Sequence, residues 1–403
     1  MSTSLVYHTQ GIVGFQVTSV QYGKGRVIAN VRRRVRNLAC TVCGSAEVTP
    51  VFVKNRLIQG MAMGRLVFCL NVALHRLRCR ACGAFRQEAL PFVSHPRARQ
   101  TRALERFVVE LRRHMSISAI AEVYGLNWKT VKEIEKRHLA RKYRHVRLKQ
   151  VRHLGLDEIY VGHKRFLTIA VDLETGAVLY VAQGRGADCL REFARRLKLA
   201  RARIEAVALD MAKGYTCWVR ENFPTAAIVY DHFHVIKLMN EKVDQVRREA
   251  VRNAPTEPER KLIKGKRWLL LHGIEQLDHE ARQELRQLWD ANRHIAIASM
   301  LKEKLRWIYA NCPDSRSAAV ELNYWCGLAD VSEIGPLEKM AATIRNHWHG
   351  ILAYWDTRLT TGRLEGFNNK IRWLIRQAFG YTDHEYFLLK IFDLPKISLQ
   401  RDL

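Results

Sequence analysis

The sequence predicts a multidomain α/β protein with a mixed-sheet core, and three observations lead to this prediction. Residues 151 to 230 alternate short apolar, strand-like runs with helical patterns. Residues 240 to 350 have a helical pattern almost throughout, and two Cys-x-x-Cys pairs lie nearer the N-terminus. With 403 residues, 48% of them hydrophobic, the chain is long enough for two or three separate cores.

The predicted core contains five strands and two helices. In chain order they are strand 151–159, strand 165–171, strand 177–183, helix 188–200, strand 204–209, helix 211–222 and strand 226–230. This order of three strands followed by two helix–strand units is typical of a mixed sheet with helices on at least one face.

The two cysteine pairs predict a structural zinc site. Cys40 and Cys43 form one pair, Cys79 and Cys82 form the other, and 35 residues separate the pairs. Strand-like runs between residues 47 and 79 predict a hairpin that brings the pairs together, as in a zinc ribbon. A redox pair or isolated buried thiols are the alternatives, but redox motifs rarely face each other in twos.

Residues 116 to 134 predict a helix-turn-helix. Gly125 marks the turn, Ser116 or Ser118 is expected to cap the first helix, and Asn127 is expected to cap the second. The second helix would present four side chains to a DNA major groove, namely Trp128, Lys129, Thr130 and Lys132. A helical hairpin that packs only internally is the alternative.

The charge balance predicts a polyanionic partner. Lys and Arg number 67 against 39 Asp and Glu, which gives a formal net charge of +28. Nucleic acid is the usual partner for such an excess, although a ribosomal or anionic membrane surface would also fit. The sequence lacks a run of about 18 apolar residues and an N-terminal signal pattern, so we expect a cytoplasmic protein.

Three acidic residues are candidates for a catalytic site. Asp157 ends the first predicted strand, Asp210 ends the fourth, and Glu365 opens a strongly patterned helix. Strand ends of such sheets often hold ligands, and phosphodiester cleavage by two divalent cations needs hard oxygen ligands. The ordinary alternative for each acid is that it caps a helix or pairs with a nearby Lys or Arg.

Several segments resemble one transposase family. Residues 38 to 86 are similar to the N-terminal zinc finger of the insertion sequence L-three (ISL3) family. The segments Ala206-Val-Ala-Leu-Asp210, Asp231-His-Phe-His234 and Gly362-Arg-Leu-Glu365-Gly-Phe-Asn-Asn-Lys-Ile-Arg372 resemble its aspartate–aspartate–glutamate (DDE) domain. The resemblance covers nearly the whole chain and implies a ribonuclease-H-like catalytic core.

The resemblance also implies roles for single residues. Asp157, Asp210 and Glu365 would hold two Mg²⁺ or Mn²⁺ ions, with Asp231 and His234 in support. Asp231 is a rival to Asp210, and Glu158 is a weaker rival to Asp157 because adjacent strand residues point to opposite faces. On the helix of Glu365, four further residues are expected to contact DNA, namely Asn369, Lys370, Arg372 and Arg376.

The resulting domain prediction has five parts. They are a zinc-finger module at 1–95, a helix-turn-helix with basic linker at 96–150, core segments at 151–240 and 351–403, and an all-α insertion at 241–350. The insertion holds five tryptophans that are expected mainly to fill helix–helix cores, although one of them could stack on a base.

The predicted function is binding of insertion-sequence ends, cleavage and strand joining by a homodimer or larger assembly. A DNA-binding regulator with a silent core, or a nuclease that does not rejoin, is the alternative.

Overall fold

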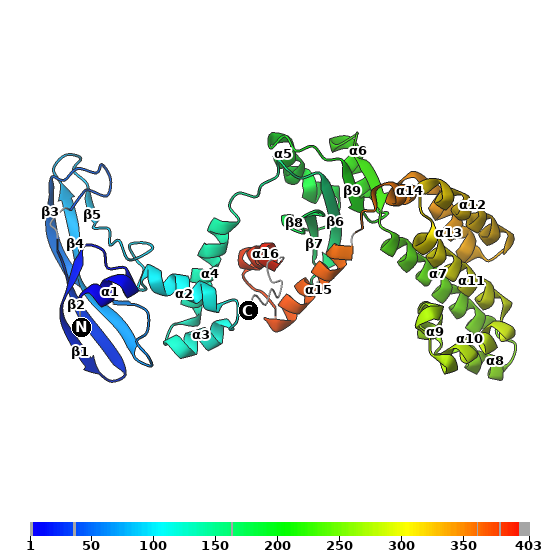
Figure 1. The fold of residues 1–403 in the computed structure, drawn as a ribbon, viewed down its shortest axis with the longest axis horizontal. Helices are drawn as coiled ribbons and strands as arrows, with labels where there is room; N and C mark the ends of the chain where they lie inside the picture. The colour runs from blue at the N-terminus through cyan, green and yellow to red at the C-terminus, as the bar shows by residue number, and fades with distance from the viewer. Residues whose placement is uncertain (1–2, 35–37, 163, 361, 379, 395–403) are drawn as a thin grey trace. The chain divides into compact units, whose positions relative to one another are not determined.

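The computed structural model describes residues 3–34, 38–162, 164–360, 362–378 and 380–394. The chain divides into two compact units, Met1–Arg144 and His145–Leu403 (Figure 1). Each unit has its own hydrophobic core.

The first unit begins with a five-stranded sheet. Its elements are α1 (Thr3–Gln10), β1 (Phe15–Gly23), β2 (Arg26–Arg33), β3 (Val48–Gln59), β4 (Val67–Cys79) and β5 (Phe85–Gln87). The strand order is β1-β2-β4-β3, with β5 on β4, and only the β2–β4 pair is parallel. The sequence predicted the β3–β4 hairpin but not β1 and β2. Polar residues in these two strands make their alternation of apolar and polar positions less evident. Phe92 and Val93, in the segment after the hairpin, are buried in this core.

Three helices complete the first unit: α2 (Arg102–Leu111), α3 (Ile117–Tyr124) and α4 (Trp128–Lys142). The predicted helix-turn-helix is confirmed in α3 and α4. The side chains of Ser116 and Asn127 accept hydrogen bonds from the first turns of α3 and α4, respectively. Gly125 ends α3 with φ of 59°, a conformation that favours glycine.

The second unit contains the mixed sheet that the sequence predicts. Its strands are β6 (His153–Tyr160), β7 (Phe166–Asp172), β8 (Val178–Gln183), β9 (Ala206–Leu209) and β10 (Ala227–Tyr230), in the order β10-β9-β6-β7-β8. The first three strands are antiparallel neighbours, whereas β9 and β10 run parallel to β6. This topology agrees with the ribonuclease-H-like core that the resemblance implies.

Helices cover both faces of this sheet. One face packs against α5 (Arg191–Leu199), which directly follows the short 3-10 turn η1 (Ala187–Leu190), and against α6 (Lys213–Asn222), which follows β9. The other face packs against α15 (Gly362–Gln377) and α16 (His384–Asp393), as Figure 1 shows for α15. The two helices of the second layer therefore come from the C-terminal end of the chain.

A helical region connects β10 to α15. It consists of α7 (His232–Asn253), α8 (Glu257–Ile263), α9 (Arg267–Leu271), η2 (Ile274–Gln276), α10 (His279–Ala291), α11 (Arg293–Asn311), α12 (Ser315–Val331), α13 (Gly335–Asn346) and α14 (Trp348–Thr357). Of its tryptophans, Trp325 is fully buried and Trp268 is 65% exposed. Within the described part of the chain, no helix is both long and apolar enough to cross a membrane.

Candidate active site and metal centre

Strand β6 presents its two acidic residues to opposite faces of the sheet. The amide Nδ2 of Asn368, on α15, donates to Asp157 Oδ2 at 2.5 Å. The adjacent Glu158 instead accepts a hydrogen bond at 2.5 Å from the hydroxyl of Tyr215, on α6. Tyr215 also contacts Thr168 Oγ1 at 3.0 Å, so Glu158 belongs to a hydrogen-bonded group beneath α6.

A glycine on the same strand lets α15 approach the sheet closely. A Cβ at Gly155 would lie 2.7 Å from side-chain carbons of both Leu173 and Leu364. Gly155 and Asp157 share one face because side chains alternate along a strand. The close packing therefore places the first turns of α15, which contain Glu365, over the face that carries Asp157. The side chain of Glu365 lies outside the described part of the structure.

Asp210 follows the end of β9 as predicted and lies near Asp157, but Asp157 is inside β6, three residues before its end, and not at the strand end that the sequence predicted. Gly155 of β6 pairs in parallel with Ala208 of β9, and each aspartate follows its paired residue by two positions. The backbone N–H of Ala212 donates to Asp210 Oδ1 at 3.0 Å, which fixes this carboxylate at the turn into α6. Neither aspartate is fully buried.

The electrostatics of Asp157 reflect these neighbours. Burial raises the pKa of Asp157 above its ordinary value, and the negative charge of Asp210 acts in the same direction. The backbone N–H of Glu158, the charge of His234 and the amide of Asn368 oppose the increase. A carboxyl group with a raised pKa beside a second carboxylate is typical of a functional site.

The two predicted supporting residues have different surroundings. His234, in the first turn of α7, is close enough to Asp157 to influence its pKa. Asp231 is only 1% exposed and lies 3.2 Å from His232 Nδ1. The ring of His232 lies 5.6 Å from that of Tyr309, on α11. Asp231 thus lies where the sheet meets the helical region, whereas His234 lies near the carboxylates.

Asn368 is a site residue that the sequence reasoning did not single out. It is 6% exposed, and its Oδ1 has no hydrogen-bond partner among the described residues. The sequence could have indicated it by position: Asn368 is a polar residue one turn after Glu365, and it lies on the apolar side of the helix with Leu364 and Ile371.

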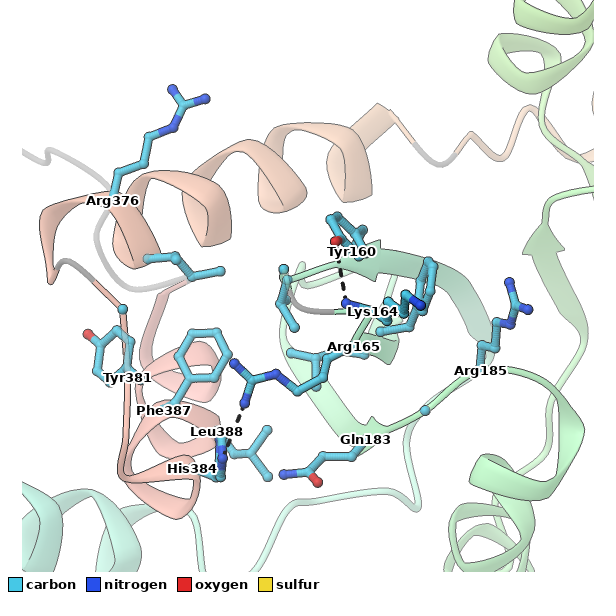
Figure 2. A pocket seen from close by; sticks show the side chains of 17 residues that line it. Tyr160, Lys164, Arg165, Gln183, Arg185, Arg376, Tyr381, His384, Phe387 and Leu388 are labelled. Carbon is cyan, nitrogen blue, oxygen red and sulfur yellow. Dashed lines mark hydrogen bonds between the residues drawn. The ribbon is translucent and has the colours of Figure 1, made fainter.

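The residues of α15 that were predicted to contact DNA point away from the sheet. Asn369, Lys370, Arg372 and Arg376 are all exposed. Arg372 Nη1 donates to Asn369 Oδ1 at 2.9 Å, one turn away. Figure 2 shows Arg376 near the end of the helix with its guanidinium directed outward. The helix therefore combines an apolar inner face with a basic outer face.

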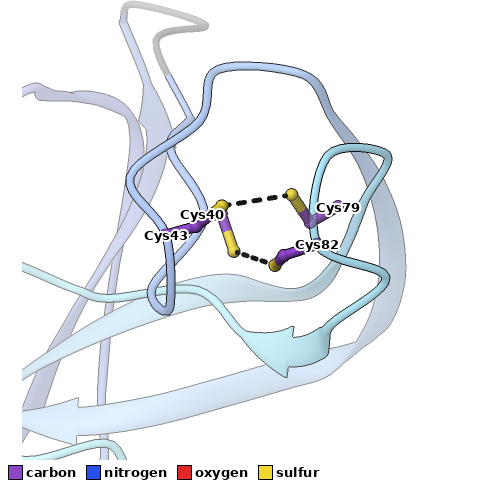
Figure 3. Close-up of side chains that lie close together, drawn as sticks. All are labelled: Cys40, Cys43, Cys79 and Cys82. Carbon is purple, nitrogen blue, oxygen red and sulfur yellow. Dashed lines mark hydrogen bonds between the residues drawn. The ribbon is translucent and has the colours of Figure 1, made fainter.

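The four predicted cysteine ligands come together in the first unit (Figure 3). Cys40 Sγ lies 3.7 Å from Cys82 Sγ, Cys43 Sγ lies 3.6 Å from Cys79 Sγ, and all four sulfurs lie within 4.8 Å of one another. Sulfurs bound tetrahedrally to zinc at about 2.3 Å lie about 3.8 Å apart, so the cluster has suitable dimensions.

The two cysteine turns have the same backbone geometry. Gly44 and Gly83 have φ values of 77° and 70°, and each donates its N–H to the carbonyl of the cysteine four residues earlier. Backbone N–H groups of Cys43 and Val42 lower the pKa of Cys40, whereas the neighbouring thiols raise the pKa of Cys82. These are properties of a metal-binding knuckle.

The second helix of the helix-turn-helix exposes part of its predicted recognition surface. Trp128 is 53% exposed, Lys129 is exposed, and Thr130 and Lys132 are partly buried. The Lys129 Nζ lies 5.7 Å from the centre of the Trp128 ring. Val131 and Ile134 point inward to the core shared with α2 and α3.

Comparison with known families assigns the chain to a class. A family model described as a transposase, of the ISL3 DDE type, matches residues 154–391. A second model, described as the helix-turn-helix domain of transposase family ISL3, matches residues 88–139. The mixed sheet and the helix-turn-helix are thus those of a DDE transposase, which is a polynucleotidyl transferase. The chain belongs to the ISL3 family of transposases.

Curated relatives agree with this assignment over almost the full length. The chain is 32% identical over 391 residues to the transposase for insertion sequence element IS1001 of Bordetella parapertussis, covering 94% of this chain and 95% of the relative. It is 30% identical over 383 residues to the transposase for IS1557 of Mycobacterium tuberculosis, covering 88% and 85%. The Drosophila P element transposase strand transfer complex aligns at a TM-score of 0.39 and 12% identity, over 74% of this chain and 92% of that chain.

Proposed function

We propose that this transposase binds the terminal inverted repeats of its own insertion sequence, cleaves the DNA there and joins the freed 3′-hydroxyl to target DNA. One observation carries the proposal: Asp157, on β6, lies near Asp210, which directly follows the neighbouring parallel strand β9, and the helix that contains Glu365 packs on the same face of β6 as Asp157. The positive charges on the outer face of α15 would attract the phosphate backbone of DNA that approaches these carboxylates.

Two divalent cations, Mg²⁺ or Mn²⁺, are the proposed cofactors of this site. The donor set fits these cations, because the carboxylate oxygens of Asp157 and Asp210 and the buried, unpartnered Oδ1 of Asn368 are all hard oxygen donors. When bound, such ions activate the attacking water or 3′-hydroxyl and stabilise the leaving oxygen. The chain's own contribution is to hold the carboxylates, with Asn368 orienting Asp157 and Ala212 orienting Asp210.

The structure favours Asp157 and Asp210 over their rivals as metal ligands. Glu158 is engaged by Tyr215 on the opposite face of the sheet. Asp231 is 1% exposed and lies against His232, so a DNA phosphate would not reach it as readily as it would reach Asp210. We therefore propose Asp157 and Asp210 as the first two ligands. We propose Glu365 as the third ligand, and His234 and Asp231 as residues that support the site.

End recognition is proposed for the first unit. The cluster of Cys40, Cys43, Cys79 and Cys82 would hold one structural Zn²⁺ and fix the β3–β4 hairpin. The helix α4 would enter a major groove with Trp128 and Lys129 foremost, while phosphates of the DNA near the cleavage site would contact the basic outer face of α15. Because both ends of an element must be held together, we propose a homodimer or larger assembly that acts on DNA in the cytoplasm.

The test of this function is end cleavage by wild type and by Asp210→Asn. A labelled duplex from the border of the element that encodes this chain is incubated with protein and Mg²⁺ or Mn²⁺. We expect cleavage by wild type and, for Asp210→Asn, unchanged binding with cleavage reduced at least about 100-fold, since one ligand carboxylate is lost. Asp188→Asn, which changes an exposed acid in the same unit, should cleave normally.

Other outcomes separate the alternatives. Specific binding without cleavage by either protein would indicate a regulator with a silent core. Cleavage without strand-joined products would indicate a nuclease. Equal cleavage by wild type and Asp210→Asn would show that Asp210 is not the second ligand.

A further inference from the structure

A large basic and aromatic hollow adjoins the carboxylate site. Its volume is about 1220 Å³, and it lies between the β6–β7 hairpin, the end of β8, the C-terminal part of α15 and the start of α16 (Figure 2). This volume exceeds the roughly 300–1,000 Å³ of pockets for drug-sized ligands. The hollow is therefore suited to an extended ligand rather than to a single small molecule.

The lining of the hollow combines positive charge with aromatic rings. Among the described residues that line it, none is acidic, and Lys164, Arg165 and Arg185 are cationic, whereas Arg376 borders the hollow with its guanidinium directed outward. Four aromatic residues, Tyr160, Phe166, Tyr381 and Phe387, also line it. Such a combination matches a ligand that carries both negative charges and flat rings.

The contacts within the hollow hold these groups in place. The rings of Tyr160 and Phe166 lie 5.3 Å apart, and the Arg185 guanidinium lies 5.0 Å from the centre of Phe166. Arg165 Nη1 lies 3.3 Å from His384 Nε2. Neither Arg165 nor Arg185 forms an ion pair with a carboxylate in the described part of the chain. Tyr160 is 54% exposed, so its ring remains accessible.

Two elements join the hollow to the candidate active site. On β6, Tyr160 follows Asp157 by three residues, so it lies at the end of the strand and its side chain leaves the face opposite to that of Asp157. On α15, Arg376 follows Asn368 by eight residues, which is about 12 Å along a helix axis at about 1.5 Å per residue. A DNA strand at the carboxylates would therefore reach the hollow within a few nucleotides.

We propose that this hollow binds an unpaired stretch of DNA strand next to the cleavage site. Duplex DNA offers phosphates but conceals the faces of its bases, whereas an unpaired strand can place phosphates on Arg165 and Arg185 and stack a base on Tyr160. This inference rests on the proposed function and adds to it the position of the single strand. It assigns the stacking to Tyr160 instead of a tryptophan of the helical region, which the sequence analysis left only as an alternative to core packing.

Fluorescence anisotropy of the full-length protein tests the proposal. The probe is a labelled oligothymidine of about 12 nucleotides, a length within the range of single-strand sites. Excess unlabelled duplex is added to occupy the helix-turn-helix. We expect Tyr160→Leu to weaken oligothymidine binding about 5- to 150-fold, the loss that corresponds to one stacked base.

Matched variants control for exposure and charge. Tyr324→Leu removes a tyrosine on α12 that is 59% exposed and should leave binding unchanged. Arg185→Gln should reduce the slope of log K against log salt by about 0.7, the value for one phosphate of a single strand. Arg220→Gln, at an exposed position on α6, should not change the slope.

Cross-linking locates the bound strand directly. An oligothymidine with one 5-iodouracil is irradiated with wild type, and the modified peptide is identified by mass spectrometry. Cross-links to the peptides that contain Tyr160, Phe166 or Tyr381 are expected, whereas cross-links confined to the first unit would overturn the proposal. Unchanged affinity of Tyr160→Leu would also overturn it.

The cleavage assay with Asp210→Asn separates the two proposals. If Tyr160→Leu binds oligothymidine normally while Asp210→Asn abolishes end cleavage, the inference fails and the function stands. If wild type does not cleave although Tyr160→Leu loses binding, the function fails and the hollow remains a single-strand site.

Discussion

At the scale of single residues, alternation along β6 decides which carboxylate belongs to the site. Asp157 contacts Asn368 of α15, and Glu158 contacts Tyr215 of α6, although the two acids are adjacent in sequence. Both interactions are hydrogen bonds from a neutral donor to a carboxylate, and such charge-assisted bonds are stronger than neutral ones. The face of the sheet, and not the residue type, therefore distinguishes the two acids.

We predict that Asn368→Ala lowers activity without unfolding the protein. Removing the amide would free Asp157 to rotate and take one oxygen donor from the site, and residues that orient metal ligands typically contribute 10- to 100-fold to metal affinity or activity. The measurements are the rate of end cleavage as a function of Mg²⁺ concentration and the thermal unfolding midpoint.

The control for this variant is Gln377→Ala, at an exposed position at the end of the same helix. It should leave the Mg²⁺ dependence unchanged. If Asn368→Ala also showed the Mg²⁺ dependence of wild type, the proposed role of Asn368 would be wrong.

At the scale of elements, two arrangements bring distant segments together. Helix α15 packs on β6 although Asn368 and Asp157 are 211 positions apart in the sequence. In the first unit, the β3–β4 pairing brings Cys79 close to Val48 and thereby brings the two cysteine turns together. The first arrangement depends on a small residue, Gly155, and the second depends on strand pairing with the four thiols at its end.

We predict that metal removal unfolds the cysteine turns and abolishes specific end binding. Cys79 is 2% exposed and lies at the end of β4, so its sulfur holds the hairpin in the cluster. A strong chelator should release about one Zn²⁺ per chain from wild type, and Cys79→Ser should lack this Zn²⁺. In both cases the region should become sensitive to proteolysis. Metal analysis and limited proteolysis measure both effects.

The matched control is Cys217→Ser, which changes an exposed cysteine on α6. It should retain its zinc and its end binding. Specific end binding by zinc-free Cys79→Ser would show that the zinc module does not contribute to recognition.

At the scale of the whole molecule, the formal charge of +28 is expected to make association with DNA depend strongly on salt. Phosphate contacts release counterions, so log K for duplex binding falls by about 0.9 per phosphate neutralised for each tenfold increase in salt. The basic residues are distributed over both units, and so is this effect.

We predict that Lys129→Gln reduces the salt slope of end binding by about 0.9, because Lys129 is exposed on α4 and would neutralise one phosphate. The measurement is duplex affinity over a series of salt concentrations. Lys339→Gln, at an exposed position in the helical region, should keep the wild-type slope. Identical slopes for wild type and Lys129→Gln would mean that this lysine does not contact a phosphate.

Much of the fold is predictable from the sequence because its signals are local. Apolar runs from 151 to 230 predicted the order of strands and helices in the core, and capping residues such as Ser116 and Asn127 predicted the helix-turn-helix. The cysteine spacing predicted the cluster. Strands β1 and β2 were not predicted; they pair with each other as a hairpin, and β2 joins them to the sheet through its parallel pairing with β4. The assignment of catalytic roles and of domain boundaries stays a prediction.

The sequence by itself determined the class of this protein: local periodicity, paired cysteines and the segments around Asp210 and Glu365 already indicated an ISL3-type transposase. Only the tertiary structure decided which groups share a site. It placed Asn368 on Asp157, assigned Glu158 to the opposite face and formed the basic, aromatic hollow from five elements, β6, β7, β8, α15 and α16. The physical reason is that secondary structure follows from neighbours in the chain, whereas a site is formed by packing between segments that periodicity does not relate.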